Sequence, residues 1–435
     1  MTTWKALFIS LCCLGAALAE GEVKSVVVLA RHGARWSFLD EKAGEVTQNG
    51  LRMAYLQGQY LRQSYPKVFS SRFRMKEHRL FSSATNRTVQ SGLALLQGLF
   101  DFGSASEEVK SSRKFVLPPW KGAKQEEDFR SQLPHNAQVF PLHSARSDFN
   151  YVFDPYDWDL CPKNSRFSPS AKNRTKGFLE LFNSFLPTLK AEKIPYEKWI
   201  NGDQLERLED WYLIYDSVSA GRYLGRLTIS DEAYDKLEIL YVLGFFIYLD
   251  KDTDRHRFYG TFLLRRIKSL LLEMKQGFLS GVSEFPRFGL LMGHDLNLLT
   301  FLYLWGQTSY ECLEQKFKTG RSEGPCFSNP PFASSLVLEL KHAPSTKQFF
   351  VAAILNGKTL DLCKHECTFD EFISTIESFT LQGSDPEILR EHCFAEELDF
   401  KRIFFWLIIA MSVVSTLLLV WLISLNSKIK KIKVM

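Results

Sequence analysis

The chain of 435 residues contains several short apolar runs that predict the strands of a sheet. Residues 26–30 and 288–292 are continuously apolar, which is typical of strands buried on both faces. Residues 79–84, 335–340 and 348–355 are the other predicted strands, and the last two are candidates for pairing with each other.

Between these runs, apolar residues recur every three or four positions, as in amphipathic helices. Such helices are predicted at 47–65, where Thr47 can cap the first turn, and from Asn86 onward. Two further helices are expected at 177–190 and 255–275. Residues 239–248 are apolar enough to form either a strand or a helix.

The order of these elements predicts an α/β fold in which a central sheet carries helices on both faces. Residues 118–237 differ in character, because they are rich in aromatic residues and proline, read as helical and contain no convincing strand. We expect residues 20–117 and 238–397 to form the α/β core, with 118–237 inserted as a mainly helical cap.

Both ends of the chain contain apolar segments of a different kind. Residues 1–19 resemble a secretory signal peptide, with Lys5, an apolar stretch and a small-residue cleavage site; an uncleaved anchor is the alternative. Residues 403–425 are apolar and uncharged, so they predict a single transmembrane helix rather than a buried core helix. Four lysines follow it in residues 426–435, which favours a cytosolic tail.

These segments predict a single-pass type I membrane protein of the secretory pathway, a lysosome-like compartment or the cell surface. They also account for the formal charge of +5, because seven of the 54 basic residues lie in or beside them. Residues 20–400 then carry 47 basic and 49 acidic residues, which argues against a nucleic-acid-binding surface.

Eight cysteines are present, and two of them fall in the predicted signal peptide. The remaining six predict three disulfides in an oxidising compartment, with fifteen possible pairings. Residues 363–367 read Cys-Lys-His-Glu-Cys, for which a zinc site is the alternative interpretation.

The first apolar run ends in Arg31-His32-Gly33-Ala34-Arg35. Ligands of open α/β sheets bind beyond the carboxyl ends of such strands. Two guanidinium groups beside an imidazole suit the binding of a phosphate while a nitrogen attacks it. The alternative for an Arg-His pair at this place is a solvated loop without a function.

This motif resembles the R-H-G-x-R-x-P pattern of the histidine acid phosphatases, the branch of the histidine phosphatase superfamily that also contains the phytases. In its organisation the chain resembles the membrane-anchored, lysosomal and prostatic type of acid phosphatase. It departs from the pattern at Trp36-Ser37, where the family usually has x-P. The loop after Arg35 is therefore expected to have a different shape.

A second motif, Gly293-His294-Asp295, follows the apolar run at 288–292 and resembles the G-H-D-T-T-L of the family, with Leu296 and Asn297 in place of the threonines. The resemblance implies that His294 binds a phosphate oxygen and that Asp295 is the general acid. Arg87 matches the R-T-x-x-S context of a further phosphate-binding arginine.

Asn86-Arg87-Thr88 is also a glycosylation sequon, which conflicts with a role of Arg87 in a phosphate pocket. We favour the catalytic interpretation of Arg87 and regard Asn173 as the better glycan acceptor.

The resemblance implies a phosphomonoester hydrolase in which His32 is the nucleophile and Arg31, Arg35, Arg87 and His294 bind phosphate. It implies no metal and no cofactor, and it leaves a homodimer open. It further implies the pairs Cys363–Cys367 and Cys161–Cys393, with Cys312 and Cys326 remaining. Alternatives are a phytase-like or lysophosphatidate-type phosphatase, a mutase-like phosphoryl transferase, and a catalytically dead surface receptor.

Overall fold

Strand β1 (Glu22–Arg31) lies in the middle of a six-stranded sheet in the computed structural model. The structure describes residues 21–100, 138–144, 150–156, 160–165, 169–200, 202–207, 210–249, 254–363 and 365–432. The predicted signal peptide, the beginning of the predicted cap and the last three residues of the tail lie outside these ranges. The chain divides into two units, residues 1–155 with 167–381 and residues 156–166 with 382–435.

The sheet of the first unit is mixed, with the order β2-β3-β1-β4-β5-β6. Strands β2 (His78–Ser82) and β3 (Phe288–Gly293) run parallel to β1, and β4 (Ser335–Ala343) runs antiparallel to it. Strand β5 (Gln348–Leu355) pairs with β4, which confirms the expected pairing of these two runs. The short strand β6 (Lys358–Leu360) was not predicted, because three residues carry no readable alternation.

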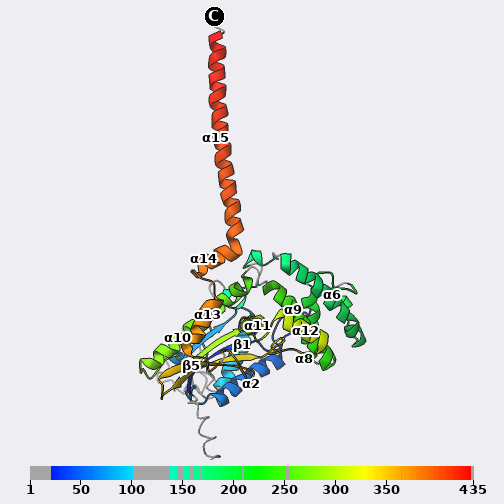
Figure 1. Ribbon diagram of the computed structural model, residues 1–435, viewed down its shortest axis with the longest axis vertical. Helices are drawn as coiled ribbons and strands as arrows, with labels where there is room; N and C mark the ends of the chain where they lie inside the picture. The colour runs from blue at the N-terminus through cyan, green and yellow to red at the C-terminus, as the bar shows by residue number, and fades with distance from the viewer. Residues whose placement is uncertain are drawn as a thin grey trace, which may run out of the picture. The chain divides into compact units, whose positions relative to one another are not determined.

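Helices cover both faces of the sheet, as expected (Figure 1). Val26, Val28 and Ala30 of β1 pack in one apolar cluster with residues of α2 (Gln48–Ser64) and α3 (Asn86–Leu99). On the other face, residues of α10 lie against Gly289 of β3. The helices of that face are α10 (Arg255–Leu279), α11 (Asp295–Leu304) and α13 (Phe369–Phe379).

Between α3 and β3, the described residues form helices and no strand (Figure 1). Residues 239–248 belong to a helix that is buried on nearly all sides, which explains why their pattern did not distinguish helix from strand. The boundaries of the inserted cap stay a prediction. Besides α10, the α-helices of this region are α5 (Asn150–Phe153), α6 (Pro169–Ala191), α7 (Glu197–Ile200), α8 (Trp211–Tyr223) and α9 (Asp231–Leu249). A further helix, α12 (Tyr310–Thr319), follows α11.

Two glycines allow α2 and α3 to pack backbone against backbone. A Cβ on Gly58 of α2 would lie 1.9 Å from the carbonyl oxygen of Leu95, and one on Gly98 of α3 would lie 1.9 Å from that of Tyr55. Neither helix can therefore carry a larger residue at this crossing without moving.

We expect Gly58→Ala to lower the free energy of unfolding by about 1–3 kcal/mol, because the added methyl group forces the two helices apart. The matched control is Gly177→Ala on α6, where a Cβ meets nothing within 4 Å and helix propensity favours alanine. Urea unfolding of both variants measures the difference. Equal stability of the two would show that the α2–α3 crossing is not tight.

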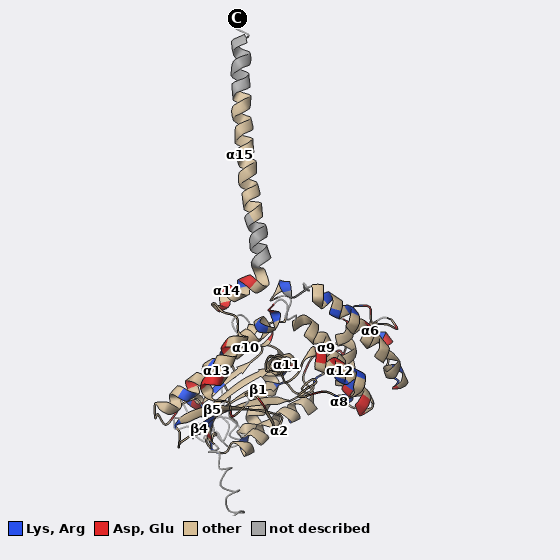
Figure 2. Cartoon of the chain, in the orientation of Figure 1, with Lys and Arg blue, Asp and Glu red and all other residues tan. Residues whose placement is uncertain are grey.

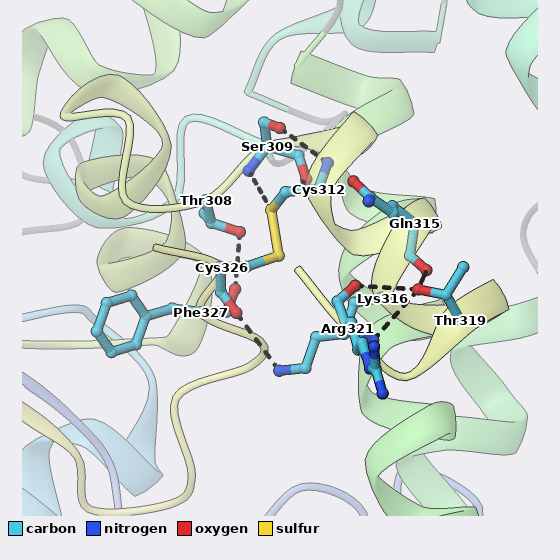
Figure 3. Close-up of a disulfide and its surroundings, with 9 residues drawn as sticks. All are labelled: Thr308, Ser309, Cys312, Gln315, Lys316, Thr319, Arg321, Cys326 and Phe327. Carbon is cyan, nitrogen blue, oxygen red and sulfur yellow. Dashed lines mark hydrogen bonds between the residues drawn. A yellow bond between two sulfur atoms is a disulfide. The ribbon is translucent and has the colours of Figure 1, made fainter. Parts of the chain in front are cut away.

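All six described cysteines form disulfides, Cys161–Cys393, Cys312–Cys326 and Cys363–Cys367. Figure 3 shows the Cys312–Cys326 bridge, which joins α12 to the segment that follows it. The pairing agrees with the one that the resemblance implied. Because the sulfurs of Cys363 and Cys367 are bonded to each other, neither is available as a thiolate for zinc.

The second unit contains α14 (Asp385–Leu389) and α15 (Ala395–Ile432). Residues Ile403–Ile423 of α15 are long and apolar enough to cross a membrane, and none of that window is buried. Figure 2 shows this part of α15 without an acidic or basic residue. These properties agree with the predicted span.

Candidate active site

The first two sequence motifs meet because β1 and β3 are parallel neighbours. Arg31 at the end of β1 pairs in register with Gly293 at the end of β3. The backbone N–H of His32 donates to the carbonyl oxygen of Gly293 at 3.1 Å. His32 and His294 therefore leave the sheet side by side, with ring centroids 5.5 Å apart.

The loop after β1 is held close to the start of α2. A Cβ on Gly33 would lie 2.0 Å from the carbonyl oxygen of Gly50, so only glycine allows this approach. The backbone N–H of Gly33 donates to the hydroxyl of Ser91 on α3 at 3.0 Å. Ser91 belongs to the same R-T-x-x-S segment as Arg87, so this bond fixes the first motif against the third.

The His32 ring has a defined tautomer. Its Nδ1 lies 2.8 Å from the carbonyl oxygen of Gly33, which can only accept, so Nδ1 carries the proton. Nε2 then carries no proton, and its lone pair accepts from Nε of Arg87 at 3.2 Å. Burial, followed by the charges of Arg87, His294, Arg31 and Arg35, holds the pKa of His32 well below its usual value. The ring is therefore neutral and nucleophilic at Nε2.

Three arginines surround His32. Arg31 forms an ion pair of 3.0 Å with Asp295, and its guanidinium lies 4.2 Å from the ring centre of Phe332. Arg35 forms an ion pair of 2.6 Å with Asp216. Arg87 forms no ion pair with a carboxylate among the described residues.

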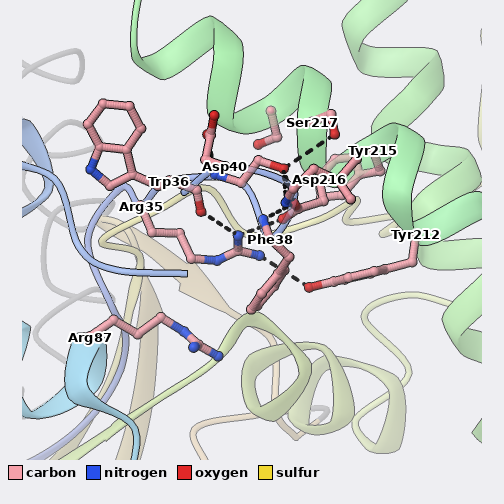
Figure 4. A network of polar contacts seen from close by, with 12 residues as sticks. Arg35, Trp36, Phe38, Asp40, Arg87, Tyr212, Tyr215, Asp216 and Ser217 are labelled. Carbon is pink, nitrogen blue, oxygen red and sulfur yellow. Dashed lines mark hydrogen bonds and ion pairs between the residues drawn. The ribbon is translucent and has the colours of Figure 1, made fainter. Parts of the chain in front are cut away.

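Asp216 of α8 fixes the loop in which the chain departs from the family pattern (Figure 4). Besides Arg35, it accepts from the hydroxyl of Ser37 at 2.7 Å and from the backbone N–H of Phe38 at 2.8 Å. Arg35 also donates to the hydroxyl of Tyr212 at 3.2 Å. The serine at the usual proline position therefore supplies a hydroxyl that ties the loop to α8.

Asp295 begins α11 and is 8% exposed. The hydroxyl of Tyr241 on α9 donates to its Oδ2 at 3.1 Å, the atom that also faces Arg31. Burial acts to raise the pKa of Asp295, but the charges of Arg31, His294 and Arg35 outweigh it, so the pKa is lowered. The carboxylate is therefore ionised in the absence of substrate.

His294 contacts a carboxylate that sequence reasoning missed. Its Nε2 lies 3.0 Å from Oδ1 of Asp154 and 3.1 Å from the hydroxyl of Ser83. Asp154 follows α5 and stands in a region without a readable motif. Tyr241 and Asp216 were missed for the same reason, because isolated residues of the helical region carry no local pattern.

All six residues expected at the site thus lie around His32 and His294, at the carboxyl ends of β1 and β3 and the start of α3. Asn86 precedes Arg87 at the start of α3, and its side chain is exposed, as is that of Asn173 on α6. The preference for Asn173 as the glycan acceptor stays a prediction.

Residues 36–131 match the model of the histidine phosphatase superfamily (branch 2). The phytase of Citrobacter braakii resembles the structure with a TM-score of 0.54 and 15% identity, over 84% of this chain and 99% of that one. The phytase of Hafnia alvei in complex with tartrate gives a TM-score of 0.54 and 13% identity, over 84% and 98%. The chain shares the fold of these two phytases.

No curated protein sequence is significantly similar to this chain. The parallel pairing of β1 and β3 explains why two motifs far apart in the sequence end at one place, since each motif follows one of these strands. The part of the chain that matches the family model contains Arg87 but begins just after Arg35.

Proposed function

We propose that this protein is a phosphomonoesterase of the histidine acid phosphatase type, which works through a phosphohistidine intermediate. The observation that carries the proposal is the state of His32: a neutral ring with Nε2 unprotonated, buried among three arginines. Nε of Arg31 and Nε of Arg35 are buried donors without a hydrogen-bond partner among the described residues. Oxygens of a bound phosphate would satisfy such donors.

In the first step, Nε2 of His32 attacks phosphorus, and the bond from phosphorus to the leaving oxygen breaks. Arg31, Arg35 and Arg87 stabilise the negative charge that spreads over the non-bridging oxygens. Asp295, once protonated, gives its proton to the leaving oxygen, so that an alcohol departs.

In the second step, water attacks the phosphorus of the phosphohistidine, and the bond from phosphorus to Nε2 breaks. Asp295, now a carboxylate, accepts a proton from that water, which restores its protonated form. Inorganic phosphate leaves and His32 returns to its neutral state. The hydrogen bond from Nδ1 to the Gly33 carbonyl keeps the same tautomer throughout.

The test is the release of inorganic phosphate from p-nitrophenyl phosphate by the full chain in detergent, measured across the acidic and neutral pH range. A rapid quench into base with labelled substrate traps the phosphoenzyme, because phosphohistidine survives base and is lost in acid. Phosphate release without a trapped phosphohistidine would show that the reaction does not pass through this intermediate. Complete absence of release would favour the alternative of a catalytically dead receptor.

The balance of charges at the site indicates how many phosphate groups its substrate carries. The carboxylates of Asp154, Asp216 and Asp295 offset the positive charges of Arg31, Arg35 and Arg87. This balance suits one phosphate group better than a substrate with several. We therefore favour a phosphatase of the lysosomal and prostatic type that acts on a substrate with a single phosphate group.

The likeness in fold to phytases makes a phytase-like activity the second candidate. Rates with inositol hexakisphosphate and with a simple alkyl monophosphate distinguish the two. A higher kcat/KM for the hexakisphosphate would reject our preference.

We further propose that α15 anchors the protein with its catalytic unit on the non-cytosolic side. A chain that ends at Glu397 lacks the apolar residues Ile403–Ile423, so we expect it to be secreted in active form. Fractionation after a carbonate wash measures this. Retention of the shortened chain in membranes would require a second anchor.

A further inference from the structure

Asp154 lies at the edge of the proposed phosphate site and contacts two side chains that also contact each other. Its Oδ1 lies 3.0 Å from Nε2 of His294, and its Oδ2 accepts from the hydroxyl of Ser83 at 3.1 Å. The same hydroxyl lies 3.1 Å from Nε2 of His294. Carboxylate, hydroxyl and imidazole therefore meet in one triangle.

The position of Asp154 is fixed by the residues on either side of this triangle. Phe153, directly before it, is fully buried, and its carbonyl oxygen accepts from the side-chain amide of Asn297 at 2.7 Å. The other end of the same side chain accepts from the backbone N–H of His294 at 2.8 Å. Asn297 thus holds Asp154 and His294 at a constant separation.

When a phosphate binds, one of its oxygens and the Asp154 carboxylate compete for one hydrogen-bond donor, Nε2 of His294. An imidazole Nε2 carries at most one hydrogen, and the Asp154 carboxylate at 3.0 Å and the Ser83 hydroxyl at 3.1 Å both lie within its reach. A phosphate oxygen bound by His294 must share or take this hydrogen. It then lies beside a carboxylate, and like charges at such a distance repel strongly in a buried site.

We propose that Asp154 is a specificity-determining residue, which makes the site select the monoanion of a phosphate over its dianion. The monoanion keeps a P–OH group, and that hydroxyl donates a hydrogen bond to the carboxylate oxygen while keeping its proton. The dianion has no such proton and meets the carboxylate as a second negative charge. This inference rests on the proposed function and on the role as a phosphate ligand that the resemblance implies for His294.

The charged and titratable groups that face Asp154 among the described residues are His294, at the start of α11, and Arg87, on α3. Burial acts to raise the pKa of Asp154, whereas His294, the Ser83 hydroxyl and Arg87 lower it, and the net effect is a lowered pKa. Asp154 therefore stays ionised over the working range. The pH dependence must then come from the ligand, since a phosphomonoester loses its second proton at about pH 6.

The experiment measures the dissociation constant of inorganic phosphate for the full chain in detergent, by calorimetry and by inhibition of p-nitrophenyl phosphate hydrolysis. Asp154→Asn keeps the shape of the side chain and removes its charge. We expect this variant to bind phosphate roughly tenfold more tightly than the wild type at about pH 8, and nearly equally at about pH 5. Asp154→Ala should behave in the same way.

Asp370→Asn is the matched control, because it removes a carboxylate from an exposed ion pair with Lys275 on the surface. It should leave phosphate binding unchanged at both pH values. Thermal unfolding of all three variants shows whether they fold.

Weaker phosphate binding by Asp154→Asn at both pH values would overturn the proposal and leave Asp154 a positioning residue of His294. An equal gain at both pH values would also reject it, because discrimination between the two ionic forms would then be absent. Failure of the proposed function looks different: the wild type would release no phosphate, although calorimetry would still report whether phosphate binds.

Discussion

Replacement of His32 by alanine will lower kcat for every phosphomonoester by roughly a thousandfold or more, since the group that forms the covalent intermediate is then missing. Nε2 of His32 is the nucleophile proposed here, and Arg87 and the Gly33 carbonyl hold its ring in place. Trapping of labelled phosphoenzyme should fail completely in this variant. The measurement combines steady-state rates with a rapid quench.

The fold should survive this change, because residue 32 bonds to the Gly293 carbonyl through its backbone N–H, which alanine also has. His365→Ala is a suitable control, since this exposed histidine lies in the loop closed by Cys363 and Cys367. It should retain full activity. A His32→Ala variant with wild-type rates would show that the phosphoryl group never passes through this residue.

Replacement of Asp295 by asparagine will separate good leaving groups from poor ones. An alkoxide needs a proton as it departs, so hydrolysis of an alkyl phosphate should fall by about 10²–10⁴-fold. Formation of the phosphoenzyme from p-nitrophenyl phosphate should fall much less, because nitrophenolate leaves without protonation. Rapid-quench measurement with both substrates gives the two rates directly.

The pH dependence of the wild type follows from the same carboxyl group. The charges of Arg31, His294 and Arg35 lower the pKa of Asp295 in the free protein, so its protonated fraction grows as the pH falls. A bound phosphate adds negative charge and raises that pKa. We therefore expect activity on alkyl phosphates to rise toward acidic pH.

This rise should be weaker for p-nitrophenyl phosphate. If Asp295→Asn slows both substrates equally, Asp295 is not the general acid but the ionic partner of Arg31.

The central part of the site could be predicted from the sequence, because its information is local. The motifs at Arg31–Arg35 and His294–Asp295 each follow directly on a continuously apolar run, and such runs become neighbouring parallel strands. The helix at 47–65 was predicted for a similar reason, and Thr47 accepts from the backbone N–H of Gly50 as a cap.

The partners of these motifs could not be predicted, because their information is not local. Asp154 and Asp216 are single acidic residues in an aromatic-rich region, and nothing in their neighbourhood marks them. Asp216 meets Ser37 across 179 positions of sequence, and Asn297 meets Phe153 across 144. Only the folded chain shows which acidic residues neutralise the arginines.

The ion pair between Arg35 and Asp216 has a consequence for the order of folding. The strands that carry His32 and His294 can pair before α8 docks, but the buried guanidinium of Arg35 then lacks its counter-charge. Closing the long loop between Arg35 and Asp216 costs conformational entropy, and this cost precedes the contact that stabilises the closed form. During refolding from denaturant, catalytic activity should therefore return later than the secondary structure of the sheet, so enzyme turnover becomes a probe of the last step of assembly.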